Sequence, residues 1–247
     1  MSRAAAPWLV EIPIAHRGLH GPGAPELSCA ALQRAVDAGI AVEIDVRLAA
    51  DRVAFVIHDA DTERVTGVRK VVAETDTADL RSLPVLDSSG PLLILDEALA
   101  VLGGRVPLLV ELKHGVAADV IGPPVLACLR GYPGPWAVQS FDPRIVRWFG
   151  RHAPQVVRGQ IAGDLTGEGL GPVRRRLLES MALNVVTRPD FLTYDVDALP
   201  SLAVTFWRRV LRCPLVVWTV RTERQRALAA SSHAGLIFED MPPPTTR

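Results

Sequence analysis

The chain has 247 residues, of which 49% are hydrophobic and 22% are charged, and its 27 Lys and Arg residues balance its 27 Asp and Glu residues. This composition is typical of a globular protein with a large core, and the zero net charge gives no indication of a nucleic acid or an anionic membrane surface as a partner. The cysteines Cys29, Cys128 and Cys213 form no CxxC pair, so we expect neither a disulfide framework nor a zinc site. The sequence contains neither an apolar run of about 18 residues nor a secretory leader pattern. We therefore expect a cytoplasmic protein without an integral membrane segment.

The first half of the chain alternates short apolar strands with helical patterns. A strand is expected at Val10–Ala15, and Ser28 is placed to cap a helix that ends at Gly39. The next strand, Ile40–Val46, continues into an antiparallel hairpin that returns over Val53–His58, because the gap is too short for a parallel crossover. Further on we expect a helical turn at Asp79–Leu83, a helix at Glu97–Leu102 capped by Asp96, a strand at Val106–Leu112 and a helix at Val116–Leu129.

The second half repeats this alternation. Asp142 and Pro143 open one helix, and Thr222 with Gln225 forms a capping-box pattern that opens the last one. The expected strands are Trp136–Ser140, Val156–Ile161, Leu183–Thr187, Leu215–Val220 and Gly235–Glu239, and the other expected helices are Val173–Met181 and Leu199–Leu211.

With the hairpin return set aside, eight strands alternate with helices. This rhythm indicates an α/β protein with a parallel sheet, and the count favours a closed (β/α)8 barrel, or TIM barrel, over an open sheet. No linker or repeat divides the chain, so a single domain of residues 1–247 is predicted. In such barrels the chemistry lies at the carboxyl ends of the strands. The side chains predicted to lie at these ends are His16, Glu43, Asp45, Glu111, Lys113, Ser140 and Trp218.

Glu43 and Asp45 are the first indication of a site. Alternate side chains of a strand share a face, so the two carboxylates point the same way, and a bound cation is the usual remedy for their repulsion. The hairpin returns His58 beside Asp45. The alternative is an amphipathic strand with one polar face and an exposed hairpin.

Glu111 also lies on an apolar strand, where we expect it to face inward, so it is a third carboxylate beside Glu43 and Asp45. Oxygen ligands without cysteine indicate a site for a hard divalent cation, Mg²⁺ or Ca²⁺, with Mn²⁺ also allowed. Lys113 lies on the same face as Glu111 in a chain whose only other lysine is Lys70, which suggests a compact ammonium group facing a phosphate. The alternative is a surface ion pair between Glu111 and Lys113.

Arg17 offers a forked donor for a phosphate oxygen beside His16. Two histidines, His16 and His58, near a metal ion and an anion are able to divide the work of a general base and a general acid. A divalent ion polarises a phosphoryl group and activates a hydroxyl nucleophile. Together these features indicate metal-assisted cleavage of a phosphodiester.

The motifs that contain these residues resemble those of the glycerophosphodiester phosphodiesterase family. The resemblance follows family order across nearly the whole chain, and the combination of motifs is more specific than any one of them. The resembling pieces are His16-Arg17-Gly18, Pro25-Glu26, Glu43-Ile44-Asp45-Val46, Val56-Ile57-His58-Asp59, Glu111-Leu112-Lys113, Ser140-Phe141, Trp218-Thr219-Val220 and Gly235–Asp240.

The resemblance implies a TIM barrel that hydrolyses glycerophosphodiesters to glycerol 3-phosphate and an alcohol. It further implies attack of the glycerol 2-hydroxyl on phosphorus, followed by opening of the cyclic phosphate by water. The implied residue roles are Glu43, Asp45 and Glu111 as ligands of one divalent cation, His16 and His58 as the acid–base pair, and Arg17, Lys113, Ser140 and Trp218 as substrate-binding residues.

The chain also departs from the family pattern. Leu27 and Ser28 stand where Asn-Thr is usual, Arg221 replaces the Asn after Trp-Thr-Val, and Glu239 replaces a Thr before Asp240. These departures concern the identity of the substrate more than catalysis. The alternatives are therefore a lysophospholipase D-like or other small phosphodiester hydrolase, and a barrel that binds a phosphate ligand without catalysis. A metal-dependent amidohydrolase is disfavoured because its first strand ends in HxH, and either a monomer or a homodimer is compatible with the sequence.

Overall fold

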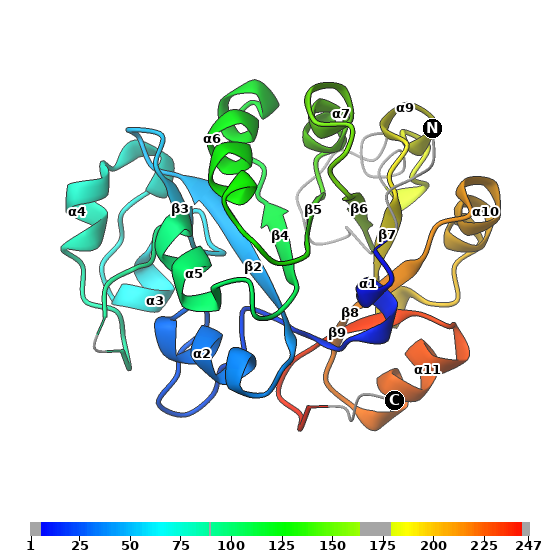
Figure 1. Ribbon diagram of the computed structural model, residues 1–247, viewed down its shortest axis with the longest axis horizontal. Coiled ribbons are helices and arrows are strands. Elements are labelled where there is room, and N and C mark those ends of the chain that lie inside the picture. Colours follow the sequence, from blue (N-terminus) through cyan, green and yellow to red (C-terminus); the bar gives the residue numbers. More distant parts are fainter. Residues whose placement is uncertain (1–5, 89, 164–178, 244–247) are drawn as a thin grey trace. The chain divides into compact units, whose positions relative to one another are not determined.

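The computed structural model describes residues 6–88, 90–163 and 179–243, in which strands and helices alternate along the chain (Figure 1). The chain divides into two compact units, of which one is Ala15–Trp136 and the other combines Met1–Ile14 with Ala137–Arg247. Each unit is a piece of parallel sheet with helices packed on it.

Strand β2 (Ala41–Leu48) lies at the centre of the unit Ala15–Trp136. It pairs in parallel with β4 (Leu108–Leu112) and antiparallel with β3 (Ala54–Val56), so the predicted hairpin is confirmed. The helix α2 (Cys29–Asp37) precedes β2, and the Ser28 hydroxyl caps it by accepting a hydrogen bond from the Ala31 amide. This unit therefore positions two parallel strand ends and one hairpin side by side.

The remaining elements of this unit cover its sheet. Helices α2 and α5 (Leu95–Leu102) lie next to one another (Figure 1). Asp96 was expected to cap α5, but the helix begins at Leu95, two residues before the expected start, and Glu97 accepts a hydrogen bond from the backbone N–H of Ile94. The other elements are β1 (Ile14–Ala15), which leads into the unit, α3 (Glu63–Thr66), η1 (Val72–Glu74), α4 (Thr77–Arg81) and α6 (Ala118–Arg130).

The second unit contains a run of parallel strands. In order along the sheet, they are β5 (Trp136–Ser140), β6 (Arg158–Ala162), β7 (Phe191–Asp195), β8 (Leu215–Val220) and β9 (Gly235–Phe238). The helical segments are α1 (Trp8–Glu11), α7 (Pro143–His152), α9 (Asn184–Thr187), η2 (Val196–Ala198), α10 (Leu202–Leu211) and α11 (Glu223–Ser231).

Two sequence predictions were wrong in this unit. The strand expected at Leu183–Thr187 is the short helix α9, and the strand follows later as β7. The position of β7 is set by a long-range contact: the Asp190 carboxylate accepts a hydrogen bond from the Arg158 amide (3.1 Å) and pairs with the Arg158 guanidinium (3.2 Å). At the N-terminus, the strand expected at Val10–Ala15 is shorter than predicted: α1 includes Val10 and Glu11, and β1 contains only Ile14 and Ala15.

The other predicted elements are present with shifts of a few residues at their ends. The capping box of Thr222 and Gln225 opens α11 as expected, and Asp142 caps α7. The helix predicted at Val173–Met181 falls largely outside the described residues. Over the residues that the structure describes, no helix has the length and apolar character needed to cross a membrane.

Candidate active site

Three buried carboxylates from β2 and β4 form the centre of the candidate site. Asp45 lies opposite Glu111 in the parallel register of these strands, and Glu43 is two residues before Asp45 on the same face. One oxygen of each carboxylate lies within 4.8 Å of the others, and the three side chains are buried. The prediction that Glu43, Asp45 and Glu111 gather at one place is therefore confirmed by their geometry.

Burial and the neighbouring charges shift the pKa values of the three carboxyl groups in different directions. Burial, reinforced by the charges of Asp45 and Glu111, raises the pKa of Glu43 well above its ordinary value. Burial also raises the pKa of Glu111, against the opposing effect of Lys113. For Asp45 burial opposes ionisation, but the charges of Lys113, His58 and Arg17 outweigh it and lower the pKa to about 2. The cluster thus requires positive charge to hold all three groups ionised.

Lys113 and Arg17 supply positive charge at the cluster. The Lys113 ammonium lies 2.8 Å from Asp45 Oδ1 and 2.6 Å from Glu111 Oε1, and the side chain is buried. The Arg17 Nε atom lies 3.3 Å from Asp45 Oδ2, and its backbone N–H donates to Glu43 Oε2 at 3.2 Å. Lys113 is therefore part of the buried cluster, and the surface ion pair considered as an alternative is excluded.

The donor set of this cluster fits a hard divalent cation. Glu43 Oε1 is buried and has no hydrogen-bond partner among the described residues, so an acceptor atom inside the cluster is left unsatisfied. Carboxylate oxygens from separate strands are the ligands that Mg²⁺ and Ca²⁺ prefer. The cluster therefore satisfies the chemical requirement for such an ion.

Arg17 reaches the cluster through the loop that follows β1. Gly18 has φ +80, and a Cβ at this position would lie 3.1 Å from Ala31 in α2, so only glycine fits the close approach of the loop to the helix. His16 precedes Arg17, and its charge helps to lower the pKa of Asp45, which brings it into the same electrostatic environment.

A chain of charged side chains leads away from His58. Its Nδ1 atom lies 2.8 Å from Asp59 Oδ1, and Asp59 Oδ2 accepts a hydrogen bond from Arg64 Nε at 2.6 Å. Arg64 also binds both carboxylate oxygens of Glu26 at 2.7 and 3.0 Å, and Arg17 binds the same carboxylate at 3.2 Å. This chain links His58 to Arg17 through three side chains that the sequence analysis did not single out for a role.

The pKa of His58 depends on burial and on these neighbouring charges. Burial lowers the pKa of His58. The charges of Lys113 and Arg17 act in the same direction, and Asp45 and Asp59 oppose the change.

Arg47 holds the backbone next to His58, because its Nε donates to the His58 carbonyl (2.8 Å) and its Nη1 to the His114 carbonyl (3.1 Å). Arg47 was missed in the sequence, although its spacing from Asp45 places it on the same face of β2.

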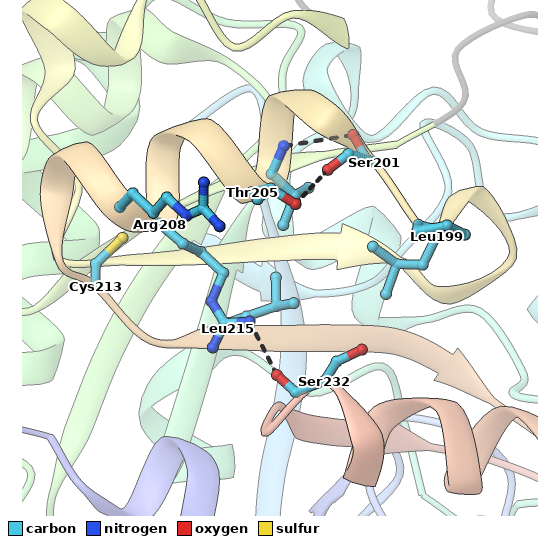
Figure 2. Close-up of a pocket in the computed structure, with 10 residues that line it drawn as sticks. Leu199, Ser201, Thr205, Arg208, Cys213, Leu215 and Ser232 are labelled. Carbon is cyan, nitrogen blue, oxygen red and sulfur yellow. Dashed lines mark hydrogen bonds between the residues drawn. The ribbon is translucent and has the colours of Figure 1, made fainter.

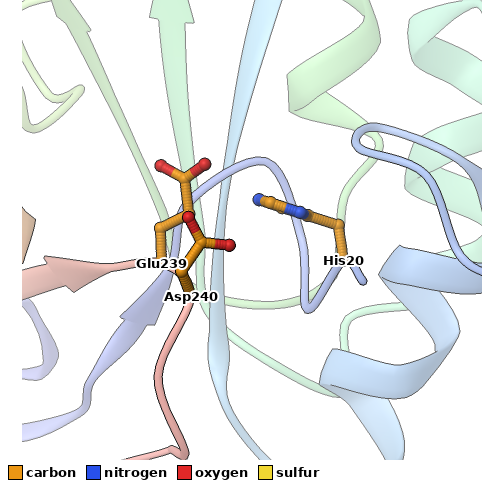
Figure 3. Close-up of side chains that lie close together, drawn as sticks. All are labelled: His20, Glu239 and Asp240. Atoms are coloured by element: carbon orange, nitrogen blue, oxygen red, sulfur yellow. The ribbon is translucent and has the colours of Figure 1, made fainter. Parts of the chain in front are cut away.

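Ser140 and Trp218 belong to the second unit, and their predicted contact with substrate stays a prediction. Ser140 is buried, and its hydroxyl accepts a hydrogen bond from the Asp142 amide at 3.0 Å. Trp218 is half-buried and packs edge-on against Phe141, with ring centroids 5.6 Å apart. Glu239 and Asp240 follow β9 in the same unit, and Figure 3 draws their side chains.

Comparison with known proteins agrees with this geometry. Residues 16–121, which carry the carboxylate cluster and both histidines, match the sequence model described as the glycerophosphoryl diester phosphodiesterase family. Residues 16–121 therefore match this family in sequence. The predicted family and the predicted enzyme class, a phosphoric diester hydrolase, are therefore confirmed. No curated protein sequence matches the chain.

Solved structures of this family share its fold. A phosphodiesterase from Oleispira antarctica, in complex with the product sn-glycerol-3-phosphate, has 22% identity and a TM-score of 0.76, with 92% of each chain covered. A glycerophosphodiester phosphodiesterase from Parabacteroides distasonis has 21% identity and a TM-score of 0.73, with 94% of this chain and 93% of that chain covered. Another from Thermotoga maritima has 20% identity and a TM-score of 0.70, with 92% of this chain and 93% of that chain covered. The predicted (β/α)8 barrel class is thereby confirmed.

Proposed function

We propose that this glycerophosphoryl diester phosphodiesterase family member hydrolyses glycerophosphodiesters to glycerol 3-phosphate and an alcohol in a reaction that depends on one divalent cation. The observation that carries the proposal is the buried cluster of Glu43, Asp45 and Glu111, with Lys113 and Arg17 in contact with it. The Oleispira antarctica structure, which holds sn-glycerol-3-phosphate, supports the choice of substrate class.

Glu43, Asp45 and Glu111 would hold the cation, which is Mg²⁺, Ca²⁺ or Mn²⁺ by the chemistry of the oxygen donors. When bound, such an ion polarises a phosphoryl oxygen and lowers the pKa of a hydroxyl nucleophile. The unsatisfied Glu43 Oε1 atom and the raised pKa of Glu43 support this assignment, since both are relieved by a positive charge inside the cluster.

Arg17 and Lys113 bind the phosphate of the substrate in this proposal. Arg17 presents a planar fork of N–H donors, and Glu26 fixes the orientation of that fork through its carboxylate. The Lys113 ammonium is a compact positive charge held by Asp45 and Glu111. Both groups compensate the negative charge that develops on the phosphoryl oxygens during the reaction.

His16 and His58 act as the acid–base pair. Asp59 is ionised, because its hydrogen bonds from His58 and Arg64 lower its pKa against the effect of burial, so Nδ1 of His58 carries the proton of the neutral ring. Nε2 of His58 is then the atom that exchanges a proton with the substrate. One histidine takes the proton of the glycerol 2-hydroxyl, the other protonates the leaving alcohol, and the two exchange roles when water opens the cyclic phosphate.

Ser140 and Trp218 complete the proposal as substrate-binding residues, with Trp218 forming an apolar wall for the glycerol or the alcohol group. We further propose a single domain of residues 1–247, a cytoplasmic location, and a monomer or homodimer. Size-exclusion chromatography with light scattering tests the oligomeric state.

The decisive assay follows turnover of glycerophosphocholine and of lysophosphatidylcholine, each with and without chelator. We expect glycerophosphocholine to be cleaved with release of glycerol 3-phosphate, and we expect chelator and Glu43→Gln to abolish turnover. The matched control Glu74→Gln changes an exposed glutamate of the same unit and leaves turnover intact. Preferred cleavage of lysophosphatidylcholine would show that the protein is a lysophospholipase D-like hydrolase. Binding of glycerol 3-phosphate by the wild type without any turnover assigns the non-catalytic alternative.

A further inference from the structure

Helix α10 exposes a stripe of large apolar side chains. Leu202, Phe206 and Val210 are 91%, 56% and 55% exposed, and their spacing of four residues places them along one face of the helix. The core-facing side of the helix is separate, since Val204 and Trp207 are buried. The stripe is therefore additional to the face that anchors α10 on the sheet, and a contiguous exposed apolar surface of this kind marks an interaction site.

Arginines lie beside this stripe. Arg208 and Arg209 belong to the last turns of α10, and Arg212 follows the helix directly. Neither Arg209 nor Arg212 has an ion-pair partner within residues 6–88, 90–163 and 179–243, and both are exposed. Because α10 contains no Asp or Glu, this surface combines an apolar stripe with uncompensated positive charge.

A pocket of about 400 Å³ adjoins the same helix. Arg208 and Arg209 line it, and no carboxylate is among the described residues that line it. Figure 2 shows Arg208 extending from α10 to the end of α11, where its Nη1 atom donates a hydrogen bond of 2.9 Å to the Ser232 carbonyl. The pocket thus provides a cationic recess directly beside the apolar stripe, a recess suited to an anionic group.

We infer that α10 is a peripheral docking face for an anionic phospholipid surface. Leu202, Phe206 and Val210 enter the boundary between headgroups and acyl chains, while Arg208 and Arg209 bind lipid phosphate groups at the pocket. A helix that carries aromatic and aliphatic side chains beside arginines is the arrangement that binds membrane interfaces. The net charge of the whole chain is zero, but Arg208, Arg209 and Arg212 give the end of α10 a local positive charge.

The charge of the surface favours lipid over a second copy of the chain. A twofold contact made through the apolar stripe would bring the arginines of both α10 helices to one interface without a carboxylate from either helix. An anionic lipid surface instead neutralises them. The inference goes beyond the proposed reaction and does not depend on it, because vesicle binding is measured without turnover.

The test is co-sedimentation of the full chain with vesicles of phosphatidylglycerol and phosphatidylcholine in equal parts, and with vesicles of phosphatidylcholine alone. We expect the wild type to sediment with the anionic vesicles, to remain in solution with the neutral ones, and to dissociate at high salt. Phe206→Ser lowers the partition coefficient about tenfold, because it removes the burial of one large side chain. Arg209→Gln lowers it about fivefold and weakens its salt dependence.

Leu86→Ser is the matched control, because Leu86 is 51% exposed and lies outside α10. This variant binds like the wild type, and thermal unfolding checks that all variants are folded. Equal binding to neutral and anionic vesicles, or unchanged binding by Phe206→Ser, overturns the inference. Self-association of the wild type that Phe206→Ser abolishes, together with no vesicle binding, overturns it as well and assigns the face to a second copy of the chain.

Discussion

Arg221 and Glu239 form an ion pair in which Arg221 Nη2 donates to Glu239 Oε2 at 2.8 Å. Arg221 follows β8 and Glu239 follows β9, and these two strands are neighbours in the sheet. Both residues depart from the family pattern, in which Asn follows Trp-Thr-Val and Thr precedes the final Asp. The two side chains therefore compensate one another in charge.

This pairing is tested by a double-mutant cycle. Arg221→Ala and Glu239→Ala are each expected to lower the free energy of unfolding, and the double variant is expected to lose about 0.5 kcal/mol less than the sum, because the Arg221 side chain is half exposed and solvent screens the pair. Urea unfolding of the four proteins measures the coupling. Strict additivity would show that the contact contributes nothing to stability.

A second prediction concerns the chain from His58 to Arg64. Asp59→Asn should lower kcat about tenfold with little change in KM, because His58 keeps its place but loses the carboxylate that holds the proton on Nδ1. Arg64→Gln should have a smaller effect of the same kind, since it acts only through Asp59 and Glu26. Steady-state kinetics with glycerophosphocholine separates kcat from KM.

Arg69→Gln is the matched control for Arg64→Gln. Arg69 is an exposed arginine that pairs with Asp61 at 3.3 Å, whereas Arg64 is the one that pairs with Asp59 and Glu26, so removal of Arg69 should leave kcat unchanged. A rise in KM with unchanged kcat for Asp59→Asn would assign Asp59 to substrate binding instead of to the orientation of His58.

A third prediction follows from the position of Lys113 between two buried carboxylates. Lys113→Met should lower the free energy of unfolding of the metal-free protein by about 3 kcal/mol, because Asp45 and Glu111 lose their nearest buried counter-charge. Divalent cation should restore part of this loss, since it replaces the missing positive charge. The measurement is urea unfolding with chelator and with Mg²⁺, and equal losses under both conditions would argue against cation binding at the cluster.

The sequence predicted the centre of this site because regular strand geometry is enough to produce it. Alternation along β2 and the parallel register with β4 are enough to bring Glu43, Asp45 and Glu111 to one face. The helix caps at Ser28 and Asp142 were equally predictable, because a cap is recognised from the residues that follow it.

Long-range contacts explain what could not be predicted. The β-branched run in α9 has the composition of a strand, and only the Arg158–Asp190 contact, which spans 32 residues, shows where β7 begins. Arg64 lies in a short helix whose position relative to Glu26 depends on tertiary packing. In α10 apolar side chains occur on two faces, so the sequence does not reveal that Trp207 is buried while its neighbour Phe206 is exposed.

The final prediction concerns pH and the Glu26 carboxylate. Burial acts to raise the pKa of Glu26, but the hydrogen bonds and charges of Arg64 and Arg17 outweigh it, and the pKa lies below its ordinary value of 4.5. A carboxylate whose pKa is lower in the folded state stabilises the fold at every pH above the pKa of the unfolded chain, and this stabilisation disappears as the pH falls through the lowered folded value. Glu26→Gln removes the titrating group while keeping its shape. We therefore expect the wild type to exceed Glu26→Gln in free energy of unfolding by about 1 kcal/mol at neutral pH, with the difference shrinking toward zero in acid below the ordinary carboxylate range. Urea unfolding of both proteins across that range measures the difference, and a gap that stays constant down to the most acidic point would show that the ionised Glu26 side chain does not stabilise the fold through its two arginines.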